Sequence, residues 1–161
     1  MSLSEQVNIG ARITAAVSVA TAITQSTAAA ATTQDGQAVD RNALGRRYYS
    51  AKAIVAAVFI GNSTAQSASL GINVQHSSDG TSWDNYSTAT VPAVTSFPAS
   101  TNSTAGTLFG TVEQSVNLIG ARRYVRIQIP PPTVSSSSSG NSFTAVTGAF
   151  VFGGADELPA V

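Results

Sequence analysis

The chain has no cysteine, few charged residues, few aromatic residues and no long apolar run. Without cysteine, neither disulfide bonds nor thiolate chemistry is available. Charged residues make up 10% of the 161 residues, whereas soluble domains usually have about 25%. The longest apolar stretch, residues 53–60, is far shorter than the roughly 20 residues that a membrane-spanning helix needs. These absences exclude a disulfide scaffold and argue against a membrane partner.

The charge balance also restricts the partners. Eight acidic and eight basic residues give a formal net charge of zero, so the basic surface that attracts nucleic acid is missing. Neutral, charge-poor surfaces tend to associate because nothing repels a second copy. We therefore expect protein partners, and we expect the chain itself to form a homotrimer. Residues 1–5 do not begin a signal peptide, which predicts synthesis and folding in a cytoplasm.

Apolar side chains alternate with polar or small ones at the beginning of the chain. The odd positions carry Val7, Ile9, Ala11, Ile13, Ala15, Val17, Val19 and Ile23. A period of two is typical of an extended strand, in which successive residues face opposite sides. Residues 1–12 precede any turn that would hold them to the domain's own sheet. We expect them to form an arm whose Val7 and Ile9 can add a strand to a neighbouring chain.

Further strands are expected at six places, separated by polar loops, and a return strand with Trp83 and Tyr86 is expected after the turn at 77–80. The stretch 48–60 has no polar face, which predicts a central strand covered on both sides. Turns are expected at residues 34–36 and 77–80, where Asp-Gly pairs occur, and a long surface loop is expected at 92–106. The six expected strands are residues 37–40, 48–60, 70–76, 107–112, 123–129 and 143–152.

About seven strands without a convincing helix predict an all-β fold, an antiparallel β-sandwich of jelly-roll type. A β-barrel is the alternative. The expected organisation is an N-terminal arm (1–12), a single sandwich domain (13–155) and a C-terminal tail (156–161).

The residues that could carry chemistry cluster at one hairpin. His76 is the only histidine and is followed by Ser77, Ser78 and Asp79. Adjacent strand residues point to opposite faces, so Ser77 should not face the His76 ring, and a catalytic triad is not expected. Asp79 and Asp84 could share a calcium ion, but Asp79-Gly80 is more simply a turn. We expect no catalysis, metal or cofactor, and we expect Trp83 to be buried against the sheet.

Two arginine clusters precede strands that begin with tyrosine. Residues 44–48 read Leu-Gly-Arg-Arg-Tyr, and residues 119–124 read Ile-Gly-Ala-Arg-Arg-Tyr. Both strands are expected to enter the sandwich from the same end. Guanidinium groups suit carboxylates, so the clusters could form a docking site for a partner chain. The alternative is strand-end arginines paired with Asp35, Asp40 or Glu113. The arginines concerned are Arg46, Arg47, Arg122, Arg123 and Arg126.

The sequence also resembles two known groups of proteins. Residues 74–83 (Val-Gln-His-Ser-Ser-Asp-Gly-Thr-Ser-Trp) and 121–127 (Ala-Arg-Arg-Tyr-Val-Arg-Ile) are similar to the hairpin and strand of discoidin-like, galactose-binding jelly rolls. They also resemble small β-sandwich virion proteins of tailed bacteriophages, and so do residues 32–40 and the strand after them. The chain lacks the cysteine pair and secretion signal usual in extracellular discoidin-like domains, which favours the phage group.

The phage resemblance implies a structural role without catalysis. It implies a head decoration (cement) protein that is located in the virion and binds the major capsid protein. A neck or tail component is the alternative within that group, and a carbohydrate-binding module is the alternative outside it.

Overall fold

The computed structural model describes residues 13–24, 32–45, 47–61, 68–86, 93–97, 106–134 and 142–155. The predicted arm (1–12) and tail (156–161) lie outside these residues. Within the described ranges the chain forms strands β1 to β11 and one short 3-10 helix, η2 (Arg41–Leu44). No described helix has the length and apolar character needed to cross a membrane.

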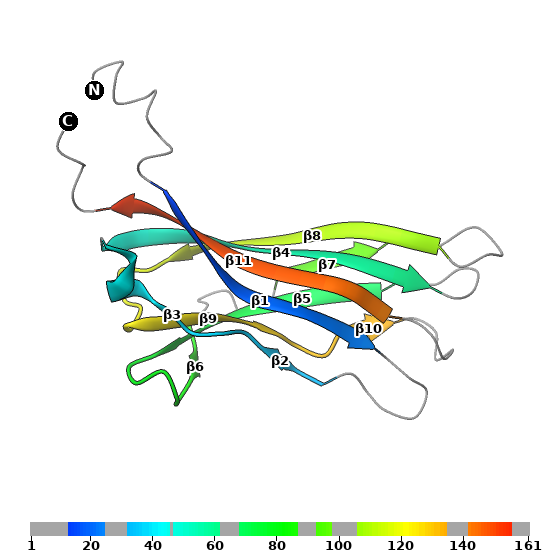
Figure 1. The fold of residues 1–161 in the computed structure, drawn as a ribbon, viewed down its shortest axis with the longest axis horizontal. Coiled ribbons are helices and arrows are strands. Elements are labelled where there is room, and N and C mark those ends of the chain that lie inside the picture. Colours follow the sequence, from blue (N-terminus) through cyan, green and yellow to red (C-terminus); the bar gives the residue numbers. More distant parts are fainter. Residues whose placement is uncertain are drawn as a thin grey trace, which may run out of the picture.

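The strands form two antiparallel sheets that pack face to face (Figure 1). The first sheet has the order β1 (Thr14–Thr24), β11 (Ser142–Ala155), β4 (Tyr48–Gly61), β8 (Gly106–Asn117). The second has the order β10 (Thr133–Val134), β5 (Ala68–Ser77), β9 (Tyr124–Ile129), β2 (Gln34–Asp35). Three short strands complete it: β3 (Val39–Asp40) on β9, and β6 (Asp84–Asn85) and β7 (Ala93–Phe97) on β5. The predicted all-β sandwich is confirmed.

The core lies between the sheets and follows the period of two. Burial in β9 alternates strictly, with Val125, Ile127 and Ile129 fully buried. From the first sheet, Phe59 packs against Phe143 with ring centroids 5.2 Å apart. Such aromatic pairs remove large apolar areas from water, and this burial is the main stabilising contribution of the core.

Several sequence expectations are corrected by the sheet pairing. Strand β4 is central, as predicted, but only its inner face is covered, and Ile54, Val58 and Ile60 remain partly exposed. Strand β7 lies within the expected loop 92–106, where it pairs with β5. Strand β8 is longer than predicted because it pairs with β4 along its full length. Strand β11 continues through Gly153 and Gly154 to Ala155.

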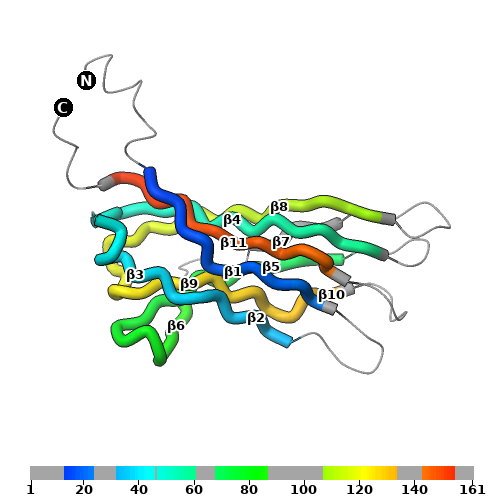
Figure 2. Tube along the Cα trace, in the orientation of Figure 1, coloured from blue at the N-terminus to red at the C-terminus, as the bar shows by residue number. Residues whose placement is uncertain are grey.

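The edge at β1 is closed by hydrogen bonds to the hydroxyl and the carbonyl of Ser18. Figure 2 shows β1 running beside β11 and next to the segment that joins β2 to β3. At a register shift between Val17 and Val19, the buried Ser18 accepts a hydrogen bond from the amide of Ile127 (3.1 Å). The Gln37 amide donates to the Ser18 carbonyl (2.6 Å). These bonds connect the first sheet to the second.

Gly36 lies in the segment between β2 and β3. The turn predicted at residues 34–36 is not formed there, because Gln34 and Asp35 belong to strand β2. The Gly36 amide donates to the Ile127 carbonyl (2.8 Å), and its φ is not among the positive values, which occur at Gly45, Gly80 and Gly154. A Cβ atom at Gly36 would lie 2.5 Å from both the Ile127 carbonyl oxygen and the Ser18 hydroxyl oxygen. Glycine is therefore required by close approach.

Replacing Gly36 with alanine should destabilise the sandwich, because the added methyl group meets backbone that cannot move independently. We expect a loss of about 1–3 kcal/mol in the free energy of unfolding, as for other overpacked sites. Urea unfolding measures this loss. Gly120→Ala is the control, since its nearest contact is the Tyr86 hydroxyl at 3.5 Å. Equal losses in both variants would contradict the close-approach explanation.

Candidate functional site

Helix η2 places one arginine inside the end of the sandwich. The helix begins after Asp40, whose carboxylate accepts a hydrogen bond from the Asn42 amide (3.0 Å), and it ends at Gly45, with φ of 74°. The Arg41 amide donates to the Arg123 carbonyl (3.0 Å), which fixes the helix against the start of β9. The Arg41 side chain is only 9% exposed.

The Arg41 guanidinium binds four backbone carbonyls. Its Nη1 donates to the carbonyls of Ala121 (2.6 Å) and Arg122 (3.1 Å). Its Nη2 donates to those of Tyr48 (2.9 Å) and Leu118 (3.1 Å). Burial, together with the nearby charge of Arg47, lowers the pKa of Arg41, although an arginine remains charged in proteins. The side chain thus joins the start of β4 to the connection between β8 and β9.

The sequence analysis did not single out Arg41. Its partners are main-chain carbonyls, which every residue carries, so no sequence pattern marks them. The expectation that β4 and β9 begin at the same end is confirmed, because one side chain reaches the carbonyls of Tyr48 and Arg122.

A small polar pocket surrounds this arginine. Its volume is about 280 Å³. Arg41 Nε is buried and has no hydrogen-bond partner. Arg47 lies over the Tyr49 ring, 5.6 Å from its centroid. A carboxylate or another small anion suits such surroundings. The pocket, hereafter the arginine pocket, is lined by Arg41, Asn42, Arg47, Tyr48, Ala121 and Arg123.

The predicted docking residues separate into three groups. Arg47 and Arg123 meet at the arginine pocket. Arg122 and Arg126 instead bind Asp84 (2.5 Å) and Asp35 (3.2 Å). Arg46, Val7 and Ile9 lie outside the described residues.

Arg123 also has an internal partner. It contacts Asp40 at 2.7 Å, and this hydrogen-bonded pairing holds the pKa of Asp40 below its usual value. Arg123 and Arg126 therefore have partners expected under the alternative interpretation, Asp40 and Asp35, whereas Arg122 pairs with Asp84, which is not among the expected partners.

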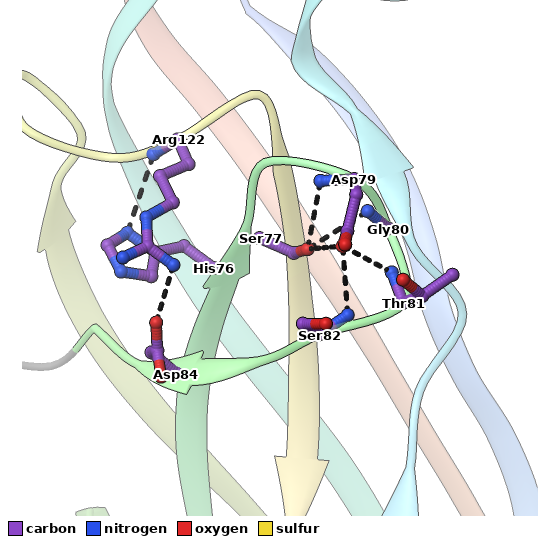
Figure 3. Close-up of polar contacts among 8 residues, drawn as sticks. All are labelled: His76, Ser77, Asp79, Gly80, Thr81, Ser82, Asp84 and Arg122. Atoms are coloured by element: carbon purple, nitrogen blue, oxygen red, sulfur yellow. Dashed lines mark hydrogen bonds and ion pairs between the residues drawn. The ribbon is translucent and has the colours of Figure 1, made fainter.

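The hairpin after β5 is organised by one carboxylate. Asp79 Oδ1 accepts hydrogen bonds from the amides of Ser82 and Thr81 and from the Ser77 hydroxyl, all at 2.8 Å (Figure 3). These bonds, the Ser82 amide foremost, hold the pKa of Asp79 far below its usual value. Gly80 has φ of 78°. The predicted Asp79-Gly80 turn is confirmed.

His76 and Ser77 lie on opposite sides of the strand (Figure 3). The His76 ring packs against Tyr86 with centroids 4.7 Å apart, and its Nδ1 accepts from the Arg122 amide (3.4 Å). Burial is the main reason why the pKa of His76 is lowered. The Ser77 hydroxyl is bonded within the turn. The hairpin therefore does not bring the imidazole to this hydroxyl.

The two carboxylates considered for calcium have separate partners. Asp79 is bonded inside the turn, whereas Asp84 binds Arg122 (Figure 3). In the described part of the chain, no group of three or more His, Asp or Glu side chains could hold a metal ion.

Trp83 does not lie in the core, contrary to expectation. It is half-buried, and the Arg126 guanidinium lies over its ring, 4.4 Å from the centroid. Arg126 Nε donates to Gln75 Oε1 (2.8 Å), and Gln75 Nε2 donates to Asn85 Oδ1 (3.0 Å). Trp83 thus belongs to a polar network on the outer face of the second sheet.

The outer face of the first sheet has the opposite character, and we call it the apolar face. Its exposed side chains include Ile13, Val17 and Phe109, which is 78% exposed. Lys52 and Glu113, also on this face, form an ion pair with each other. A groove of about 500 Å³ crosses the face and is lined by Ala56, Ala57, Val58, Phe109, Gly110, Thr111, Ala145 and Thr147.

Comparisons of the sequence with protein-family models and with curated proteins find no match.

Replacing Arg41 with lysine should destabilise the protein although the charge is kept. A lysine lacks the planar fork, so at least two buried carbonyls would lose their donor, and each such loss costs about 1–3 kcal/mol. We expect the free energy of unfolding to fall by about 2–4 kcal/mol in urea titrations. Arg47→Lys, at an exposed position, is the control and should change it by less than about 0.5 kcal/mol. Equal losses in the free energy of unfolding for Arg41→Lys and Arg47→Lys would show that the Arg41 hydrogen bonds do not stabilise this end of the sandwich.

Replacing Asp79 with asparagine should reduce the loss of stability in acid. The folded pKa of Asp79 lies below the unfolded value of about 3.9. Its contribution is therefore complete above that value and declines as pH falls through it toward the folded pKa. Urea unfolding at about pH 7 and pH 3 should show a smaller difference for Asp79→Asn than for the parent. Ser78→Ala, in the same turn, should keep the parent's full pH dependence.

Proposed function

We propose that this protein is a non-catalytic structural protein of a tailed-phage virion, and more specifically a head decoration protein that binds the major capsid protein. The sandwich fold and the resemblance of the hairpin and arginine strand to phage virion proteins support the proposal. The observation that carries it is the apolar face of the first sheet, which the described residues of the domain leave exposed.

The size of this face suits a stable protein interface. Four strands at a spacing of about 4.8 Å, each about 11 residues long with a rise of about 3.3 Å, cover roughly 700 Å². Standard interfaces bury about 800 Å² per partner. Phe109 is the kind of large aromatic residue that anchors such interfaces. Lys52 and Glu113 form an ion pair, so burying this face does not bury an unpaired charge.

The two outer faces would then have different roles. The outer face of the second sheet carries charged and amide side chains that bond to one another, including Arg126, Asp35 and Gln128. Such a surface remains stable in water. The apolar face would rest on the shell while the polar face points outward.

The proposed mechanism is mechanical. Many copies would each bridge neighbouring capsid subunits, so a modest interface per copy is multiplied by repetition. We propose a homotrimer as the bound form, and residues 1–12, with Val7 and Ile9, as an arm that adds a strand to a neighbour.

One observation favours a second candidate. Trp83, which is partly exposed, could stack on a sugar, as in a carbohydrate-binding module of the discoidin-like type. Binding to a glycan array that is lost in Trp83→Ala, without binding to capsids, would support this second function.

Replacing Phe109 with aspartate should weaken capsid binding, because a charge would be buried in the interface without a partner. We expect at least about a tenfold loss of affinity, as for other large aromatic side chains that anchor an interface. Co-sedimentation with capsids of the encoding phage, assembled without this protein, measures the affinity. Ser78→Asp adds the same charge on the distant hairpin and should bind as the parent does. Unchanged binding of a folded Phe109→Asp variant would refute the proposed surface.

A further inference from the structure

His76, the only histidine of the chain, lies where three elements meet at one end of the sandwich. It follows the fully buried Val74 by two positions, so it continues the inward-facing side of β5. Its backbone pairs with Asp84 of β6 and with Val125 of β9. A change at this side chain can therefore reach both neighbouring strands.

The imidazole is the acceptor for one backbone amide. Nδ1 of His76 accepts a hydrogen bond from the amide of Arg122 (3.4 Å), which lies in the connection between β8 and β9 (Figure 3). A neutral imidazole has one acceptor nitrogen, whereas both nitrogens of the protonated ring are donors. The bond therefore requires a neutral His76 with its proton on Nε2.

The charged groups near the imidazole come from two of these elements. Arg122 belongs to the β8–β9 connection and Asp84 to β6, and the two side chains form an ion pair (Figure 3). The Tyr86 ring packs against the imidazole, and its hydroxyl donates to the Asn117 carbonyl (2.7 Å). The buried Arg41 binds carbonyls of the same connection. A proton on the imidazole would thus add a positive charge close to the Arg122 guanidinium.

We propose that protonation of His76 releases the β8–β9 connection from the end of β5. The imidazole would change from an acceptor to a donor opposite the Arg122 amide, so a hydrogen bond would be replaced by a contact between two donors. The connection includes Ala121 and Arg123, which line the arginine pocket, so the shape of this pocket would depend on pH. The inference does not depend on a role in the virion.

The direction of the pH dependence follows from the surroundings of the ring. Burial, and then the positive charge of Arg122, lower the pKa of His76, while Asp84 acts in the opposite direction. An unfolded histidine has a pKa of about 6.5. The contribution of His76 to stability is therefore complete above about pH 6.5 and declines as pH falls through this value toward the folded pKa. Release is expected on mild acidification, as in other histidine switches.

Amide hydrogen exchange, followed by NMR between about pH 5 and pH 7.5, tests the release at the bond itself. Only His76 contributes an imidazole C2–H signal, so the same samples report its protonation. As this signal titrates, the protection factor of the Arg122 amide should fall by about two- to tenfold, which corresponds to one net hydrogen bond. The Gly36 amide, which donates to the Ile127 carbonyl, is the reference and should keep its protection factor.

Two variants separate the imidazole from the rest of the cluster. Asparagine at position 76 keeps an acceptor oxygen near the place of Nδ1 and does not titrate. His76→Asn should therefore hold the protection factor of the Arg122 amide constant over this pH range. Tyr86→Phe is the matched control, because it keeps the ring and loses only the hydroxyl bond to Asn117. It should retain the parent's pH dependence.

Either of two results would overturn the proposal. A constant protection factor at Arg122 in the parent, while the His76 signal titrates, would show that the imidazole does not hold the connection. This measurement needs no substitution, so it stands even if a variant fails to fold. The parent's pH dependence persisting in His76→Asn would assign the effect to another group.

Discussion

The guanidinium of Arg41 holds the end of the sandwich at which both arginine-bearing strands begin. Its four bonds reach carbonyls that belong to the start of β4 and to the connection between β8 and β9. A buried cation without such partners would be strongly unfavourable, because charge loses its hydration inside a protein. The path of the chain at this end, and therefore the arginine pocket, depends on that set of bonds.

The outer faces of the two sheets differ in chemical character. Both sheets bury one face against the other, so each has a second face that the part of the chain described by the structure does not cover. On the second sheet, Arg126 and Gln75 bond to their neighbours and to each other. On the first, the residues around Phe109 are small and mostly apolar, with Thr111 and Thr147 among them. This difference favours binding of a partner to the outer face of the first sheet, because burying apolar side chains lowers the free energy whereas burying polar ones does not.

Much of the fold could be predicted because its periodicity is local. The alternation in residues 123–129 directly reflects the two faces of β9. In β1, the register shift between Val17 and Val19 interrupts the alternation, so that Ile13 and Val17 are exposed while Val19 and Ile23 lie in the core. The failures have a common cause. Strand β7 has a sequence typical of a loop and is held by pairing with β5, and β4 looked covered on both sides because apolar residues also occupy its uncovered face. Of the candidate site, Arg47 and Arg123 could be predicted, but Arg41 could not, since its partners are backbone carbonyls.

The fold class, the Asp79-Gly80 turn and the arginine clusters could be read from the amino-acid sequence, because each depends on neighbouring residues and on backbone preferences. The folded chain was needed to learn which arginines are paired, which sheet face stays exposed and why Gly36 has no side chain. These features depend on contacts between segments far apart in the chain, such as Ser18 with Ile127 and Arg41 with Leu118. Such contacts follow from the packing of two sheets, which no local pattern specifies.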